Sequence, residues 1–136
     1  MSEVEDRIAL QDVMLRYAAG VDDRDMALYR SCFADDLVVV GMAHEPVHGA
    51  DAWVTFVEGA LERYGSTQHM LGPQLAFIDG DEASTRNDVQ ALHVMKDAPD
   101  TIFTLWATYR TDMRRIDGVW KIVRHELVSR ATHTLN

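Results

Sequence analysis

Three carboxylates interrupt an otherwise apolar stretch near the start of the chain. The segment LRYAAGVDDRDMALYRSCFADD carries Asp22, Asp23 and Asp25 between two apolar helical patterns. One interpretation is a corner between two helices, because Asp22 or Asp23 can cap the second helix. The other is that one of these acids points into a pocket and works with one of the 6 histidines. A histidine–carboxylate pair suits proton transfer, because the ordinary histidine pKa lies near neutral pH and a carboxylate stabilises the imidazolium.

Length, charge and cysteine content restrict the partners of such a pair. The 136 residues fit a single domain spanning 1–136 that can bury a core of its own. The net charge of −9 disfavours nucleic acid and anionic membranes as partners. Cys32 is the one cysteine, so no internal disulfide forms, and the acidic N-terminus does not resemble a signal peptide. We therefore expect a cytoplasmic protein. The chain has no histidine or cysteine cluster at metal-ligand spacing, so we expect no metal and no cofactor.

Periodicity divides the chain into helices first and strands afterwards. Apolar residues recur at three- and four-residue steps over residues 4–20, about 24–33 and 50–64, which predicts three amphipathic helices. A β-rich apolar run at 37–43 predicts a buried strand. Further strands are predicted between turn signals, over 66–78 with a break near Gly72–Pro73, and over 82–95, 101–116 and 119–131. This order predicts an α+β fold, with a curved antiparallel sheet wrapped around the N-terminal helices and a cavity between them.

Alternation within the strands separates an inner face from an outer face. In the strand 101–116, Phe103, Leu105 and Tyr109 share one face, while Trp106 lies among threonines on the other. A tryptophan on that outer face predicts a covered surface and hence a homodimer. His93 shares a face with Val89 and Ala91, and we interpret it as core packing.

The chain resembles the SnoaL-like branch of the nuclear transport factor 2-like superfamily. The resemblance is carried by IALQDVMLRYAAGVDDRDMALYRSCFADD, HGADAWVTFVEGAL, STQHML and RRIDGVWKIVRHELVSR, and it extends over essentially the whole chain. It implies a cone-shaped α+β fold. It is less specific for function, because this fold serves lyases, isomerases, hydrolases and non-catalytic subunits.

In site pattern the chain is most similar to scytalone dehydratase, bile-acid 7α-dehydratase and hexachlorocyclohexane dehydrochlorinase. The resemblance implies an Asp–His dyad, in which Asp22 of AAGVDDR orients His69 of TQHML as the base. Tyr17 matches a cavity tyrosine, and His125 of WKIVRHE stands where one relative has an arginine; these two would polarise a carbonyl or protonate a leaving group. The implied substrate is a small, apolar, cyclic, hydroxylated carbonyl compound. The residues expected to line its cavity are Phe103, Leu105, Tyr109, Trp53, Phe56 and Val123.

Three alternatives remain open. Arg86 and Asp88 in STRNDVQAL resemble part of the Asp–Arg–Asp site of limonene epoxide hydrolase, a hydrolase on the same fold. Alternation groups this pair with Gln90, opposite apolar Val89, and therefore favours a solvated ion pair on the outer sheet face. The two non-enzyme alternatives are a small-ligand-binding cone without turnover and a scaffold like the small subunit of a ring-hydroxylating dioxygenase. The short chain, without long partner-binding arms, weighs against the scaffold.

Overall fold

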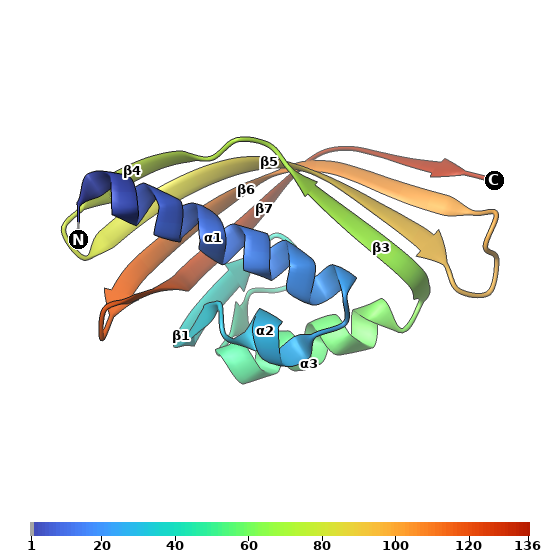
Figure 1. The fold of residues 1–136 in the computed structure, drawn as a ribbon. Helices are drawn as coiled ribbons and strands as arrows, with labels where there is room; N and C mark the ends of the chain where they lie inside the picture. Colours follow the sequence, from blue (N-terminus) through green and yellow to red (C-terminus); the bar gives the residue numbers. More distant parts are fainter. Residues whose placement is uncertain (1) are drawn as a thin grey trace.

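Three helices lie under a curved, unclosed sheet in the computed structural model, which describes residues 2–136 (Figure 1). The helices are α1 (Glu3–Asp22), α2 (Met26–Arg30) and α3 (Ala50–Leu61). The strands are β1 (Phe33–Val40), β2 (Val47–His48), β3 (Tyr64–Leu71), β4 (Leu75–Asp79), β5 (Glu82–Met95), β6 (Ile102–Ile116) and β7 (Val119–Leu135). The predicted α+β class, with N-terminal helices against a curved sheet, is confirmed.

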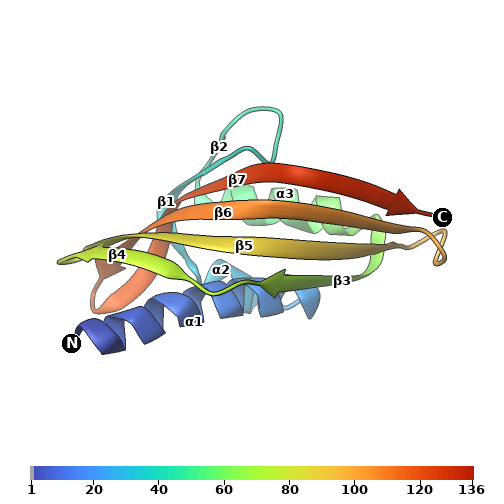
Figure 2. The ribbon, with the colours of Figure 1, turned by 90° about the horizontal axis from the view of Figure 1, so that it is seen from above.

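The strands follow the order β2–β1–β7–β6–β5–β3, and β4 also pairs with β5 (Figure 2). β5, β6 and β7 form an antiparallel meander. β3 and β4 pair with successive parts of β5, as one strand broken at Gly72–Pro73 would. β1 runs parallel to β7, so the sheet is not purely antiparallel. The outcome is one curved layer whose inner face is covered by helices.

Helix α1 begins at a serine cap and buries one side against the sheet. The Ser2 hydroxyl accepts a hydrogen bond from the Glu5 backbone N–H at 3.1 Å, which satisfies one of the free donors of the first turn. The buried positions recur at helical spacing and include Leu10, Met14 and Tyr17. Ile8, which the periodicity placed on this face, is 63% exposed. None of the helices in the described part of the chain is long and apolar enough to cross a membrane.

Strand β1 begins earlier than its sequence predicts, at the expense of α2. The predicted helix over 24–33 shortens to five residues, because Phe33 pairs with Ile122 of β7 and the Ile122 N–H donates to Cys32 O at 2.8 Å. Asp35 and Asp36, which looked like a helix stop, continue the strand with exposed side chains. Pairing with β7 therefore overrides the local preference of these acids for a turn.

Strand β7 contains an irregularity that changes which residues face inward. Asp112 pairs with Arg124, whereas the next residue of β6, Met113, pairs with Ile122, so Val123 is an extra residue in β7. Trp120 and Ile122 are buried before this bulge, and His125 is buried after it. The alternation in this part of the sequence was therefore ambiguous.

Candidate active site

Asp22 and His69 meet at the end of α1. His69 Nδ1 lies 2.8 Å from Asp22 Oδ1, and the His69 backbone N–H donates to Asp22 Oδ2 at 2.7 Å. The His69 side chain is 11% exposed and the Asp22 side chain is 18% exposed. Because a carboxylate accepts hydrogen bonds, it holds the proton of a neutral His69 on Nδ1 and leaves Nε2 unprotonated. A histidine in this arrangement can act as a base through Nε2.

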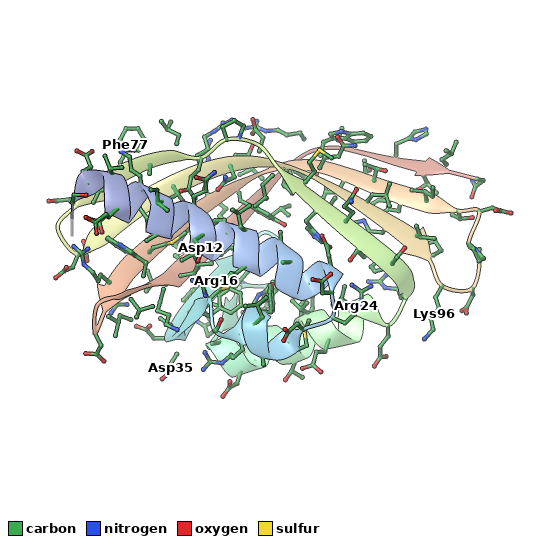
Figure 3. All side chains as sticks on the ribbon, viewed as in Figure 1. Asp12, Arg16, Arg24, Asp35, Phe77 and Lys96 are labelled. Atoms are coloured by element: carbon green, nitrogen blue, oxygen red, sulfur yellow. The ribbon has the colours of Figure 1, made fainter. Side chains whose placement is uncertain are left out.

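The carboxylate of Asp22 is itself held by β3. The Thr67 hydroxyl donates to Asp22 Oδ1 at 3.0 Å, and Arg24 Nη1 donates to that hydroxyl at 2.8 Å. Arg24 lies where α1 ends, beside β3 (Figure 3). Burial alone would raise the pKa of Asp22, but the hydrogen bonds from His69 and Thr67 outweigh it and lower this pKa below its usual value. Asp22 is therefore ionised at neutral pH.

His69 lines a cavity between the helices and the inner face of the sheet. The cavity has a volume of about 240 Å³, and most of its lining is apolar or aromatic. Helix α3 contributes Trp53 and Phe56, whose rings stack at 5.4 Å. Leu105 and Tyr109 of β6 complete the opposite side. Such a lining suits a flat, largely apolar compound.

Four of the six residues expected around this cavity lie there, and two do not. Trp53, Phe56, Leu105 and Tyr109 line it. Phe103 instead packs against His93, with ring centroids 5.3 Å apart. Val123 is the extra residue of the β7 bulge and lies in a separate groove with Phe77 and Arg114, which corrects its expected inward placement.

Tyr17 reaches the cavity, and His125 lies behind it. His125 Nε2 is 3.0 Å from the Tyr17 hydroxyl, and its Nδ1 is 2.8 Å from the Thr111 hydroxyl. His125 is completely buried and is not among the cavity-lining residues. Burial lowers the pKa of His125 to about 3, so it is neutral at physiological pH. This corrects the expectation that His125 acts on the substrate as an acid.

His93 is a cavity residue to which the sequence analysis assigned only packing. Its ring lies 5.9 Å from the ring of His69, and its Nδ1 is 3.1 Å from Phe103 O. Since a carbonyl oxygen only accepts, Nδ1 carries the proton and Nε2 can accept. Burial lowers the pKa of His93. The alternation that grouped His93 with Val89 and Ala91 correctly placed it on the inner face, but it could not show that this part of the face borders the cavity.

The Arg86–Asp88 pair lies on the other side of the sheet. The two side chains form an ion pair of 3.2 Å and are 44% and 64% exposed. Buried and exposed residues alternate along β5, so this pair faces away from the cavity that Ala91 lines. The epoxide hydrolase-like site built on Arg86 and Asp88 is therefore excluded from this cavity.

Among residues 2–136, no group of three or more histidine, cysteine or acidic side chains is arranged to hold a metal ion. What the cavity does offer is proton-transfer chemistry. It presents one carboxylate-supported imidazole in His69, and next to it a tyrosine and a second histidine, Tyr17 and His93.

Comparisons with known proteins find a sequence relative and several structures of the same fold. An uncharacterized protein of Mycobacterium tuberculosis is 29% identical over 132 residues, covering 91% of this chain and 85% of the relative. A hexachlorocyclohexane dehydrochlorinase of type 2 superimposes with a TM-score of 0.88 at 22% identity, covering 98% of this chain and 90% of that one.

Two further structures come from Novosphingobium aromaticivorans, each with a TM-score of 0.88. A proposed scytalone dehydratase is 24% identical and covers 96% of this chain and 87% of its own. A proposed aromatic ring hydroxylase is 27% identical, and the match covers 98% of this chain and 96% of that one. The SnoaL-like domain family matches residues 2–126. The chain therefore belongs to the SnoaL-like domain family.

Proposed function

We propose that this protein is a cofactor-free lyase that dehydrates or isomerises a small cyclic hydroxylated carbonyl compound. The observation that carries the proposal is the hydrogen bond of 2.8 Å between His69 Nδ1 and Asp22 Oδ1 at the edge of an apolar cavity. It leaves His69 Nε2 as the basic nitrogen. Two structural neighbours, a dehydrochlorinase and a proposed scytalone dehydratase, support elimination as the type of reaction.

In the dehydration, His69 Nε2 removes a proton from the carbon beside the carbonyl group. The electrons of the broken C–H bond form the new C=C bond, and the C–O bond of the leaving hydroxyl breaks. The proton taken up by His69 returns to the departing hydroxyl, which leaves as water. Asp22 stabilises the transient imidazolium, and its negative charge is more effective here than in water because the site is partly buried. Tyr17 lies on the same cavity and can hydrogen-bond the carbonyl oxygen.

The proposal is tested with a panel of cyclic β-hydroxy ketones, by following the ultraviolet absorbance of the enone product. We expect Asp22→Asn to lower kcat by about 10²- to 10⁴-fold, because asparagine keeps the shape but cannot stabilise the imidazolium. Asp23→Asn is the matched control, since Asp23 is the exposed neighbouring acid and should leave the rate unchanged. No turnover of the panel by the wild type, or full activity in Asp22→Asn, would reject the dyad.

A second candidate is a scaffold or binding domain without turnover. It is the main alternative because the same fold serves non-catalytic subunits as well as enzymes. A protein of this kind would bind a cyclic ketone without converting it. His69→Ala would then change only the affinity for the ligand, measured by calorimetry, while the wild type would produce no enone.

A further inference from the structure

A line of three hydrogen-bonding side chains runs from the sheet to the cavity. The Thr111 hydroxyl lies 2.8 Å from His125 Nδ1, and His125 Nε2 lies 3.0 Å from the Tyr17 hydroxyl. Thr111 is 1% exposed and His125 is 0% exposed. Tyr17 is the member of this line that lines the cavity. Among the hydrogen bonds of this line, the one to Tyr17 is therefore the route by which Thr111 and His125 can influence a bound compound.

The direction of these hydrogen bonds follows from their donors. A neutral imidazole carries one proton, on Nδ1 or on Nε2. With the proton on Nδ1, the imidazole would donate to Thr111, and the Thr111 hydroxyl hydrogen would need another acceptor. Within residues 2–136 the structure gives the Thr111 hydroxyl no hydrogen bond besides the one to His125. Since buried polar groups are normally paired, Thr111 donates to Nδ1 and the proton lies on Nε2.

This arrangement determines what the tyrosine can do. With the proton on Nε2, His125 donates to the Tyr17 oxygen, and the Tyr17 hydroxyl hydrogen points away from His125. On that side the hydroxyls of Tyr29 and Tyr109 also interact with Tyr17, so the oxygen of a bound compound competes with them for this hydrogen. In the opposite arrangement Tyr17 would donate to His125 and offer only its oxygen. Tyr29 provides an independent parallel, because the indole N–H of Trp53, which can only donate, lies 2.9 Å from the Tyr29 hydroxyl. Both tyrosine oxygens thus accept a hydrogen bond from a ring N–H of the protein.

We propose that Thr111 and His125 are positioning residues, which orient the Tyr17 hydroxyl so that it donates to the oxygen atom of a bound enol, enolate or phenol. The inference deepens the proposed function and rests on it for its catalytic meaning. It defines the substrate class as compounds that gain negative charge on an oxygen atom when a neighbouring carbon loses its proton. A fixed donor aimed at such an oxygen stabilises the charge without having to reorient during the reaction.

The first test is the tautomer of His125, which NMR of ¹⁵N-histidine-labelled protein reports directly. We expect Nε2 to carry the proton and Nδ1 to have the chemical shift of an unprotonated nitrogen. The signals of His125 are assigned as those that Thr111→Val shifts. A proton on Nδ1 would overturn the proposal, because Tyr17 would then be the donor to His125. If Thr111 had a purely structural role, neither tautomer of His125 would be preferred.

The second test uses para-nitrophenol, whose phenolate resembles an enolate and whose absorbance reports its ionisation when bound. Thr111→Val removes the hydroxyl with little change of shape, and we expect it to weaken phenolate binding about tenfold. Tyr17→Phe should weaken it by at least as much. Thr111→Ser restores the hydroxyl and should restore binding to within about threefold of the wild type.

Thr85→Val is the matched control for the loss of a buried threonine hydroxyl. Thr85 pairs with Thr111 across the sheet. The Thr85 hydroxyl donates to the Thr111 backbone oxygen at 3.3 Å rather than to the ring of His125. Equal losses in Thr85→Val and Thr111→Val, or unchanged binding in Tyr17→Phe, would overturn the proposal. Neither test needs turnover, so an inactive wild type would reject the proposed function and leave the measurement on Tyr17 intact.

Discussion

His69, which lines the cavity, and His125, which lies behind Tyr17, differ in the groups that surround them. His69 faces the carboxylate of Asp22, which can balance a positive charge on the ring. His125 faces the hydroxyls of Tyr17 and Thr111, and both of its ring nitrogens are occupied. Burial lowers its pKa to about 3, so His125 remains neutral while the unfolded chain titrates near 6.5. His69 is therefore arranged to take up a second proton, whereas His125 is arranged to stay neutral.

This difference predicts a loss of stability in acid that depends on His125. Above pH 6.5, His125 is neutral in both the folded and the unfolded chain and does not affect the pH dependence. As the pH falls below that value, only the unfolded chain takes up the proton, so the free energy of unfolding decreases until the folded pKa of about 3 is reached. Between pH 6.5 and pH 4.5 this contribution amounts to about 2 kcal/mol.

Chemical denaturation of the wild type and of His125→Gln at these two pH values measures the effect. Over this pH interval the free energy of unfolding should fall by about 2 kcal/mol less in the variant than in the wild type, whatever the stability of the variant at neutral pH. His133→Gln serves as the control, because His133 is exposed and should keep the wild-type slope. Identical slopes for the wild type and His125→Gln would contradict the buried, neutral state of His125.

The sequence identified the members of the Asp22–His69 pair but not their supporting residues. Asp22 and His69 could be selected because short motifs around them resemble those of a family, and the structure places them in contact. Thr67 lies within the STQHML motif, but its role comes from Asp22, 45 residues away in the chain. Thr111 lies in no motif, and its partner His125 is 14 residues away. The position of His125 behind Tyr17 could not be read from the sequence, because the bulge at Val123 shifts the alternation of β7.

At the scale of elements, the end of α1 depends on close packing against α2. The helix predicted over residues 4–20 continues through Gly20 to Asp22. A Cβ atom on Gly20 would lie 2.8 Å from the backbone nitrogen of Tyr29. Real Cβ atoms do not approach backbone so closely, so α2 would have to move. Gly20 thus permits the helix contact that carries Asp22 towards β3.

Gly20→Ala should therefore destabilise the protein by about 1–3 kcal/mol, because overpacking outweighs the gain in helix propensity. Gly59→Ala is the matched control. Gly59 lies in α3 with nothing within 4 Å of an added Cβ, so alanine there should be neutral or should stabilise by up to about 1 kcal/mol. Thermal unfolding of both variants measures the difference. An unfolding temperature that Gly20→Ala leaves unchanged would show that α1 and α2 can move apart without loss of stability.

The strands were easier to predict than the helix ends. Hairpin signals at Asp79–Gly80 and Asp117–Gly118 set the starts of β5 and β7, and β5 has the predicted bounds. The last strand, predicted over 119–131, continues as β7 to Leu135 beside β6. Such pairing is contributed by a distant part of the chain, and local residue types carry little information about it.

At the scale of the whole molecule, the outer face of the sheet carries apolar side chains that a monomer would leave in water. Met70 of β3 and Trp106 of β6 lie at the same level on either side of β5, since both pair with Gln90. Leu75 and Phe77 of β4 are also exposed (Phe77 is labelled in Figure 3). Ion pairs such as Arg86–Asp88 lie among them and combine both signs of charge on one surface. A second copy of the same face would match these features, as in a twofold dimer.

We therefore expect the protein to form a homodimer through the outer sheet face. Trp106→Glu would place charge in the centre of the contact and should raise the dissociation constant by at least about tenfold, since tryptophans often dominate such interfaces. Sedimentation velocity over a range of protein concentrations measures it. Ile8→Glu is the control, because Ile8 is exposed on α1, which covers the opposite face of the sheet. A wild type that stays monomeric, or equal dissociation in both variants, would show that this outer face is solvated.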